Sequence, residues 1–364
     1  MKSEDNEICF VFVYLGKDIP EYVYENIIRT ISIFPHVQTW LITDQLDFDR
    51  FSVVPNLKYY LFERNYRDKN SNIEISNLDR NFRNGFWQLT LERILALTEF
   101  HTKFNNKKII HIESDVIVFP NFPINKFKVN DKLSWTIQND IEDSPAIIFL
   151  PNMNESKWLE FEILKRIKGF DSHTDMSILA AIRNFAPERV NVLPSNKVID
   201  NEIIAKNEKT NVSLCYKASD SRNFDGIFDS LTLGIWIAGI DPRNFYGFTK
   251  LHSRNLIDFS FTVIDPSSAK YVNDKDGNLF IESKTSLTPI YNLHVHSKNR
   301  YLFTNNEWKT ELARLTSLAN LITHPILDSF SIRLLLSLLV KNIRDRTFFS
   351  YMRNIPFIKN ILSH

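Results

Sequence analysis

The chain has 364 residues, with 44 Lys plus Arg against 43 Asp plus Glu, so its formal net charge is +1. This balance argues against a nucleic-acid-binding protein, because neutralising a phosphate backbone needs a clustered excess of basic side chains. Apolar residues make up 43% and charged residues 24% of the chain, which is typical of a folded globular protein and excludes a disordered one.

The cysteines and the N-terminal residues predict the compartment. Cys9 and Cys215 are too few for a disulfide framework, and residues 1–7 are polar, without the features of a signal peptide or membrane anchor. We therefore expect a cytoplasmic protein. The eight glycines include no Gly-rich nucleotide-binding fingerprint, which disfavours standard Rossmann and P-loop cradles.

The first part of the chain predicts alternating strands and helices. Residues 8–15 form a continuous β-branched and aromatic run, typical of a strand that is buried on both faces of a sheet. Further strands are predicted at 37–43 and 57–62. Between the first two, a helix is predicted from Pro20 to Pro35, with an apolar stripe formed by Tyr22, Ile27, Ile28 and Ile31. This order predicts βαβ winding.

The middle of the chain continues the α/β pattern. The polar stretch 64–85 predicts a long loop of the kind that serves as a lid or binding loop. After a helix at 86–104, an apolar strand at 108–119 is interrupted by Glu113-Ser114-Asp115. The remaining predicted elements are strands at 134–137, 146–150 and 290–295, helices at 155–168 and from Thr174-Asp175, and a hairpin at Asp276-Gly277. We predict an α/β fold with a mixed sheet flanked by helices.

The pattern becomes helical after about residue 300, which predicts a domain at 1–300 and a C-terminal helical extension at 301–364. The apolar run 326–340 is too short to span a bilayer and is interrupted by charges. Residues 331–364 carry six basic side chains against one acidic, a local excess of +5. Two interpretations stay open: a helical subdomain that packs on the body, or peripheral contact with an anionic membrane surface.

Glu113 and Asp115 stand out because they lie between two apolar segments. In an extended backbone, side chains two residues apart point to the same side, so both carboxylates could hold one Mg²⁺ or Mn²⁺ ion. The same acidic spacing occurs elsewhere in this chain, but in polar surroundings. Buried charges are costly unless they are paired or bound to a metal. The alternative is a salt bridge, for example to Arg93 or Arg83, or an exposed strand end.

A second group of candidates closes the last predicted strand. His294 and His296 would share a face there, and Lys298 would follow if the strand continued. An imidazole could complete a metal site, and a lysine could offset negative charge on a departing diphosphate. The alternative is that both histidines are ordinary structural residues.

The third group is the stretch 224–244, which holds three of the eight glycines, three acidic residues and one arginine. Such a composition indicates close backbone approaches near carboxylates. Asp229 is a candidate catalytic residue or sugar contact. The alternative interpretation is a buried turn that begins at Asp241-Pro242.

These three groups, in this order, resemble bacterial nucleotide-sugar-dependent glycosyltransferases of the GT-A fold, of the kind that build surface polysaccharides such as O-antigen or capsule. The resemblance spans about residues 8–300. It is carried by Gly85-Phe86-Trp87 with Glu92-Arg93, by IIHIESDVIVF (109–119), by FDSLTLGIWIAGIDPRN (228–244) and by NLHVHSKN (292–299).

The resemblance implies a DxD-like motif in which the first Asp is replaced by Glu113. Asp115 would be a ligand of Mn²⁺ or Mg²⁺, Glu113 would contact the metal or the ribose, and His294 or His296 would be the third ligand. The nucleotide-sugar donor, for which we expect a UDP-sugar, would be lined by Tyr14, Leu15 and Asp44 and contacted by Arg93 and Lys298.

The implied reaction is transfer of a hexose or N-acetylhexosamine to a glycan or lipid-linked acceptor in polysaccharide biosynthesis. An inverting enzyme needs a carboxylate base, for which Asp229, Asp241 and Asp175 are candidates, whereas a retaining enzyme can lack one. Two other classes remain: a metal-dependent phosphohydrolase that uses the same acids and histidines, and a non-catalytic glycan-binding protein whose aromatic residues, 13% of the chain, serve as sugar platforms.

Overall fold

The computed structural model describes residues 7–16, 18–45, 54–63, 85–104, 107–167, 174–196, 212–219, 224–241, 263–283, 286–304 and 307–322. The chain divides into two compact units, Met1–Ala319 and Asn320–His364. The predicted loop at 64–85, apart from its last residue, and the basic C-terminal segment lie outside the described residues. The functional boundary near residue 300 stays a prediction.

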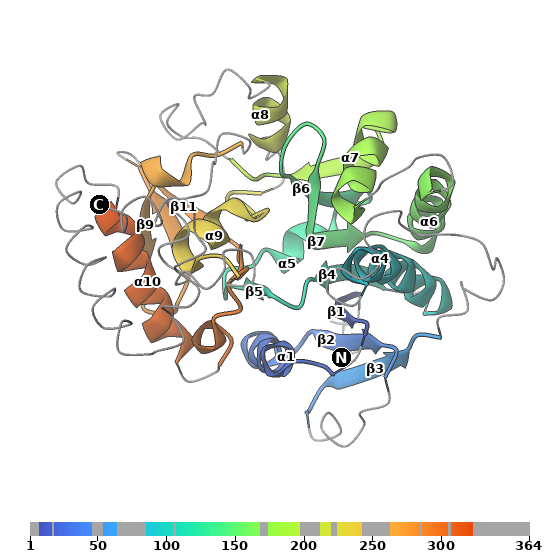
Figure 1. Cartoon of the computed structure of the whole chain (residues 1–364), viewed down its shortest axis with the longest axis horizontal. Helices are drawn as coiled ribbons and strands as arrows, with labels where there is room; N and C mark the ends of the chain where they lie inside the picture. The colour runs from blue at the N-terminus through green and yellow to red at the C-terminus, as the bar shows by residue number, and fades with distance from the viewer. Residues whose placement is uncertain are drawn as a thin grey trace, which may run out of the picture. The chain divides into compact units, whose positions relative to one another are not determined.

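A seven-stranded mixed sheet forms the centre of the first unit, in the order β3-β2-β1-β4-β7-β6-β8 (Figure 1). β7 runs antiparallel to both of its neighbours, and the other pairs are parallel. The strands are β1 (Ile8–Tyr14), β2 (Gln38–Thr43), β3 (Leu57–Leu61), β4 (Lys108–Ile112), β6 (Leu133–Ile137), β7 (Asp143–Leu150) and β8 (Val190–Leu193). The predicted mixed α/β sheet is confirmed.

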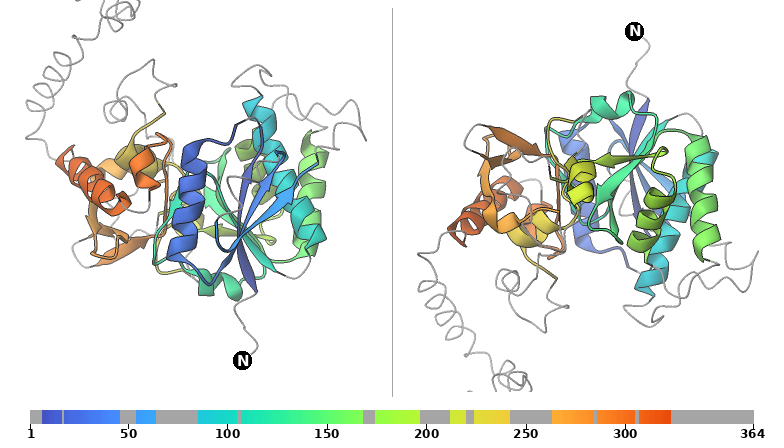
Figure 2. Two further views of the ribbon diagram at one scale, coloured as in Figure 1. Left: turned by 90° about the horizontal axis from the view of Figure 1, so that it is seen from below. Right: turned by 90° about the horizontal axis from the view of Figure 1, so that it is seen from above.

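Helices cover both faces of this sheet, as Figure 2 shows. One face packs against α1 (Glu21–Ile33), and the other packs against α4 (Phe86–Lys103), α6 (Met153–Ile167) and α7 (Asp175–Phe185). Both faces of β1 are therefore buried, as its continuous apolar sequence predicts. The start of α7 is fixed by a capping box, in which Thr174 Oγ1 accepts a hydrogen bond from Ser177 N at 3.0 Å.

Two segments that the sequence predicts as single strands are each divided between two sheets. The segment 108–119 contains β4 and β5 (Val116–Val118). The segment 290–295 begins with the last residue of β11 (Leu287–Ile290) and then contains β12 (Asn292–His294). β5 and β12 pair antiparallel in a two-stranded ribbon outside the main sheet. The prediction of one strand in each segment is wrong, because the hydrophobic pattern does not reveal where the chain leaves one sheet and enters another.

A small antiparallel sheet contains β9 (Lys270–Asn273), β10 (Leu279–Glu282) and β11. The predicted hairpin joins β9 to β10, where Gly277 adopts a φ of 89°. A Cβ at Gly277 would lie 2.3 Å from the ring of Trp308, the first residue of α10 (Trp308–Ile322), so the hairpin packs closely on that helix.

Several short elements have no clear pattern in the sequence. They are α5 (Ile124–Lys128), α8 (Val212–Ser219), α9 (Thr232–Ala238) and the 3₁₀ turns at Pro266–Ser268 and Arg300–Leu302. In the part of the chain that the structure describes, no helix combines the length and apolar character needed to cross a membrane.

Candidate metal centre and active site

The predicted site residues of the N-terminal half gather at one edge of the main sheet. β1, β2 and β4 are parallel, so their carboxyl ends share an edge, where ligands of open α/β sheets bind. Glu113 follows β4 directly, and Asp44 accepts a hydrogen bond from Gly16 N at 3.0 Å, which joins the ends of β1 and β2. Tyr14 and Leu15 lie at the same edge; their contact with a nucleotide stays a prediction.

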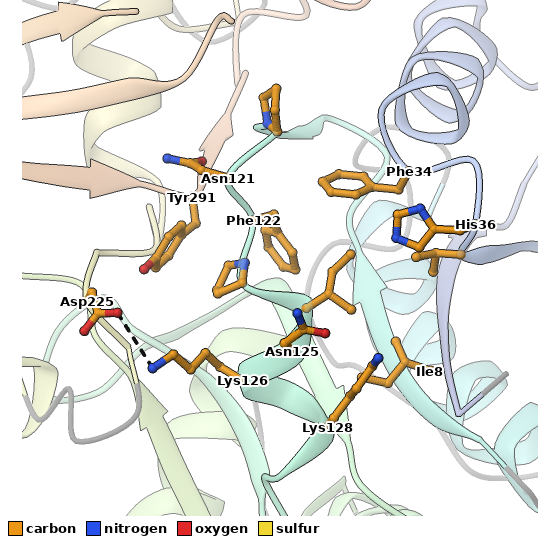
Figure 3. A pocket seen from close by; sticks show the side chains of 14 residues that line it. Ile8, Phe34, His36, Asn121, Phe122, Asn125, Lys126, Lys128, Asp225 and Tyr291 are labelled. Atoms are coloured by element: carbon orange, nitrogen blue, oxygen red, sulfur yellow. Dashed lines mark ion pairs between the residues drawn. The ribbon is translucent and has the colours of Figure 1, made fainter. Parts of the chain in front are cut away.

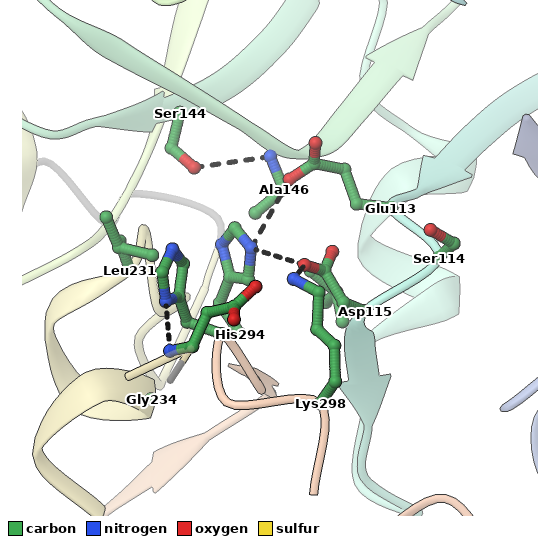
Figure 4. Close-up of polar contacts among 12 residues, drawn as sticks. Glu113, Ser114, Asp115, Ser144, Ala146, Leu231, Gly234, His294 and Lys298 are labelled. Atoms are coloured by element: carbon green, nitrogen blue, oxygen red, sulfur yellow. Dashed lines mark hydrogen bonds and ion pairs between the residues drawn. The ribbon is translucent and has the colours of Figure 1, made fainter. Parts of the chain in front are cut away.

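Three of the predicted metal ligands come together. Ligand atoms of Glu113, Asp115 and His294 all lie within 4.8 Å of one another. The Nε2 atom of His294 is 3.4 Å from Asp115 Oδ2 and 3.8 Å from Glu113 Oε2 (Figure 4). The ribbon brings this about, because the register of β12 places His294 opposite Val116, the residue after Asp115.

The two carboxylates converge through a turn and not through strand alternation. The N–H of Val116 donates to the carbonyl of Glu113 at 3.0 Å, so the chain folds back at Ser114 and Asp115. The premise that both residues share one face of an extended strand is therefore wrong, although their convergence is confirmed.

Arg93 fixes one oxygen of Glu113. Its guanidinium is 2.5 Å from Glu113 Oε1 and 3.3 Å from Asp175 Oδ2, so it bridges α4, the turn after β4 and the start of α7. The pKa of the Asp175 carboxyl is raised, chiefly by burial. The ion pair considered for Arg93 is thus present, and its contact with a donor stays a prediction.

Lys298 places a positive charge next to Asp115, because its ammonium contacts Asp115 Oδ2. Burial acts to raise the pKa of Asp115, but the Lys298 ammonium and the His294 imidazole hold it well below its ordinary value. Burial acts to lower the pKa of His294, and the carboxylates of Asp115 and Glu113 raise it to about 9. Its Nδ1 lies 3.3 Å from the carbonyl of Ser230, to which it donates, so Nε2 faces the acids.

These side chains fit a divalent cation. Glu113 Oε2 is buried and has no hydrogen-bond partner among the described residues, so one lone pair points into the cluster unsatisfied. Two ligand atoms that each lie about 2.1 Å from the same ion are roughly 3–4 Å apart. The distances from His294 Nε2 to the two carboxylates, 3.4 and 3.8 Å, fall within this range. Two carboxylates and one imidazole are a donor set that can hold a divalent metal ion.

Asp229 lies next to this group, but its carboxylate is engaged by backbone. Its two oxygens accept hydrogen bonds of 2.8–3.1 Å from the N–H groups of Leu231, Leu233, Gly234 and His294. Asp229 thereby ties the first turn of α9 to β12. This geometry favours a positioning role, and the catalytic role of Asp229 stays a prediction.

His296 and Asp241 form a neighbouring pair. The strand ends at His294, where His296 N donates back to the His294 carbonyl at 2.8 Å, so the predicted alternation toward Lys298 does not continue. His296 Nδ1 accepts a hydrogen bond from Asp241 N at 3.1 Å, and burial lowers the pKa of His296 to about 3. The structure therefore brings His294, and not His296, to the acids. Pro242-Arg243-Asn244, quoted with Asp241, lie outside the described residues.

Two buried polar residues of α1 that hold carbonyls of the segment 114–118 were not recognised from the sequence. Asn26 and Arg29 are fully buried, whereas Ile28, predicted on the apolar stripe, is 39% exposed. Asn26 stands three residues after the buried Val23 and thus at a core-facing position of the helix. A polar residue at a core-facing position is the sequence feature from which a role for Asn26 could have been predicted.

A separate cavity of about 620 Å³ opens at the other end of the ribbon (Figure 3). Its lining includes Ile8 at the start of β1, and Tyr291, which precedes β12. One side holds an ion pair between Lys126 and Asp225 at 3.7 Å. The amino end of β1 lies opposite the edge that carries Glu113, so this cavity is not part of the candidate site.

Comparisons with known proteins give partial likenesses only. No family model and no curated protein matches the chain. Among solved structures, the glycosyltransferase GlyE of Streptococcus pneumoniae TIGR4 matches 52% of this chain and 45% of its own, with 10% identity and a TM-score of 0.36. The bifunctional glycosyltransferase WbbM matches 59% of this chain and 44% of its own, with 14% identity and a TM-score of 0.35. The PaToxG glycosyltransferase matches 50% of this chain and 70% of its own, with 13% identity and a TM-score of 0.33. The chain thus spans under half the length of GlyE and WbbM. Since these TM-scores are below 0.5, we infer function from the geometry of the site.

Proposed function

We propose that this chain is a metal-dependent glycosyltransferase that transfers a sugar from a nucleotide-diphosphate sugar to a glycan or lipid-linked acceptor in polysaccharide biosynthesis. The observation that supports this proposal is the cluster of Glu113, Asp115 and His294, with the unsatisfied Glu113 Oε2, at the carboxyl edge of the sheet. In this proposal these three side chains hold Mn²⁺ or Mg²⁺, which when bound offsets the charge of the donor diphosphate.

The remaining residues take supporting roles in the proposal. Lys298 lies beside Asp115 and is suited to neutralise charge on the leaving diphosphate. Arg93 holds Glu113 in place. Asp241, buried beside His296, is the candidate base for an acceptor hydroxyl, since the Asp229 carboxylate is occupied by four backbone N–H groups.

A titration with UDP-sugars in the presence and absence of Mn²⁺ tests the proposal. We expect wild-type protein to bind a UDP-sugar in a Mn²⁺-dependent manner and Asp115→Ala to lose this binding. Asp225→Ala is the matched control, because Asp225 is an acidic residue whose side chain is 80% exposed and lies at the separate cavity. Unchanged binding in Asp115→Ala would show that the metal role is wrong.

Two further assays of the wild-type protein test the other two classes of function, the phosphohydrolase and the glycan-binding protein. A metal-dependent phosphohydrolase would turn over p-nitrophenyl phosphate without a sugar acceptor, whereas a transferase would show slow hydrolysis of the nucleotide sugar at most. A glycan-binding protein would be retained on an immobilised glycan in EDTA and would bind no nucleotide.

The basic segment 331–364 suits an enzyme that meets a lipid-linked acceptor at an anionic membrane surface. Deletion of this segment should then abolish co-sedimentation with phosphatidylserine vesicles and preserve turnover of a soluble acceptor. Co-sedimentation that survives the deletion would exclude this part of the proposal.

A further inference from the structure

The two edges of β5 are bound by different partners. One edge pairs with β12, and the pairing extends to Asp115, whose carbonyl accepts from Val295 N at 2.8 Å. Because carbonyls alternate along a strand, those of Ser114, Val116 and Val118 point to the opposite edge. No strand lies at that edge in the described part of the chain, and α1 is there instead.

Two side chains of α1 take the place of the missing strand. Asn26 Nδ2 donates to the carbonyls of Ser114 and Val116, at 3.1 and 2.8 Å, and Arg29 donates from one terminal nitrogen to the carbonyl of Val118 at 3.0 Å. Asn26 and Arg29 are one helical turn apart, so their spacing matches that of the carbonyls along the strand.

We infer that Asn26 is a positioning residue for the proposed metal ligands, because its amide fixes the turn from which Glu113 and Asp115 project. Ser114 lies between these two acids, and Asn26 holds its carbonyl. The inference rests on the proposed metal site.

The burial of Asn26 supports a dedicated role. Its Oδ1 is buried without a hydrogen-bond partner among the described residues, a cost that an apolar side chain at this core-facing position would avoid. The two carbonyl acceptors also determine the orientation of the amide, since a flipped amide would place Oδ1 against both carbonyl oxygens.

Arg29 provides the matched comparison. It is equally buried on the same helix and also holds a carbonyl of β5, but that of Val118, which lies three residues after Asp115. Its guanidinium stacks on the ring of Trp308, 4.2 Å from the centroid. Loss of Arg29 should therefore loosen α10 and the far end of β5, while the turn at Ser114 keeps its hydrogen bond.

The experiment measures the affinity of the full chain for Mn²⁺ alone by electron paramagnetic resonance, together with thermal unfolding. Asn26→Asp keeps the shape of the side chain and removes both N–H donors, so we expect Mn²⁺ affinity to fall by about tenfold or more. Arg29→Met should lower the melting temperature and leave the affinity within about twofold. Asn26→Ser keeps one donor in a smaller side chain and should fall between wild type and Asn26→Asp.

The outcomes separate this inference from the proposed function. If Asp115→Ala abolishes Mn²⁺ binding and Asn26→Asp and Asn26→Ser do not weaken it, the positioning role is wrong and the metal site stands. Equal losses of affinity in Asn26→Asp and Arg29→Met also overturn the inference, because general destabilisation then explains both. If wild-type protein and Asp115→Ala behave alike, the metal site and the inference fall together.

Discussion

At the scale of single residues, the contact between the Lys298 ammonium and Asp115 affects how tightly the site holds a cation. A divalent ion that binds Asp115 must compete with this positive charge. We expect Lys298→Met to raise Mn²⁺ affinity by about three- to tenfold, or about 0.7–1.4 kcal/mol. Turnover should fall, because the same ammonium would no longer offset the charge of the leaving diphosphate.

Isothermal titration with Mn²⁺ and steady-state turnover measure the two effects of Lys298→Met. Lys126→Met is the control, since Lys126 pairs with Asp225 at the separate cavity and should change neither value. A lower Mn²⁺ affinity in Lys298→Met would show that the lysine helps to organise the acids and does not compete for them.

At this scale the residue types of the site can be predicted from the sequence better than their geometry. Glu113 and Asp115 stand out because charged groups between apolar segments are costly, and this cost is visible in the sequence. His294 stands out because it alternates with His296 and Lys298 at the end of the last predicted strand. The choice between His294 and His296 was not visible, because it depends on the strand ending at His294 and on Asp241 N binding His296. Such contacts between distant segments leave no local pattern.

At the scale of elements, the close approach of α9 to β12 gives a prediction at Gly234. A Cβ at this position would lie 1.9 Å from the carbonyl oxygen of His294 and 2.9 Å from Asp229 Oδ2. Gly234→Ala should therefore push α9 away from β12, lower the free energy of unfolding by about 1–3 kcal/mol, and weaken Mn²⁺ binding through displacement of His294. Urea unfolding and Mn²⁺ titration measure the two effects.

Gly226→Ala is the matched control for Gly234→Ala. A Cβ at Gly226 would lie 2.4 Å from the carbonyl oxygen of Pro289, near the opposite end of the ribbon from His294. We expect a comparable loss of stability with unchanged Mn²⁺ affinity. If both variants weaken Mn²⁺ binding equally, the contact between α9 and β12 has no special part in placing His294.

The elements of the main sheet were largely predictable, and those around the site were not. Strands buried on both faces and amphipathic helices carry their pattern within one segment, so β1, α1 and α4 agree with the predicted ranges. The ribbon of β5 and β12 has three residues in each strand, and its formation depends on a turn and on pairing across about 175 residues of chain. Short elements of this kind are defined by tertiary contacts and not by local periodicity.

At the scale of the whole molecule, buried His101 links folding stability to pH. His101 lies on α4, where its Nδ1 is 2.6 Å from the hydroxyl of Ser156 on α6, and its side chain is 1% exposed. Burial lowers its pKa from 6.5 to about 4. Between these two values the unfolded chain binds a proton that the native histidine does not, so stability is present above pH 6.5 and falls as the pH falls toward 4.

We expect His101→Gln to reduce the loss of folding stability between pH 6.5 and 4. The full shift corresponds to about 3 kcal/mol between pH 6.5 and 4, and glutamine keeps polar atoms near Ser156 without titrating. Urea unfolding at pH 7.5, 6, 5 and 4.5 separates the packing cost of the substitution, which is the same at every pH, from the change in slope. The remaining slope belongs to other groups, among them His111, whose pKa burial lowers to about 3. Parallel stability curves for the variant and the wild type would show that native His101 binds its proton over the same pH range as in the unfolded chain, and that the packing of α6 on α4 tolerates its charge.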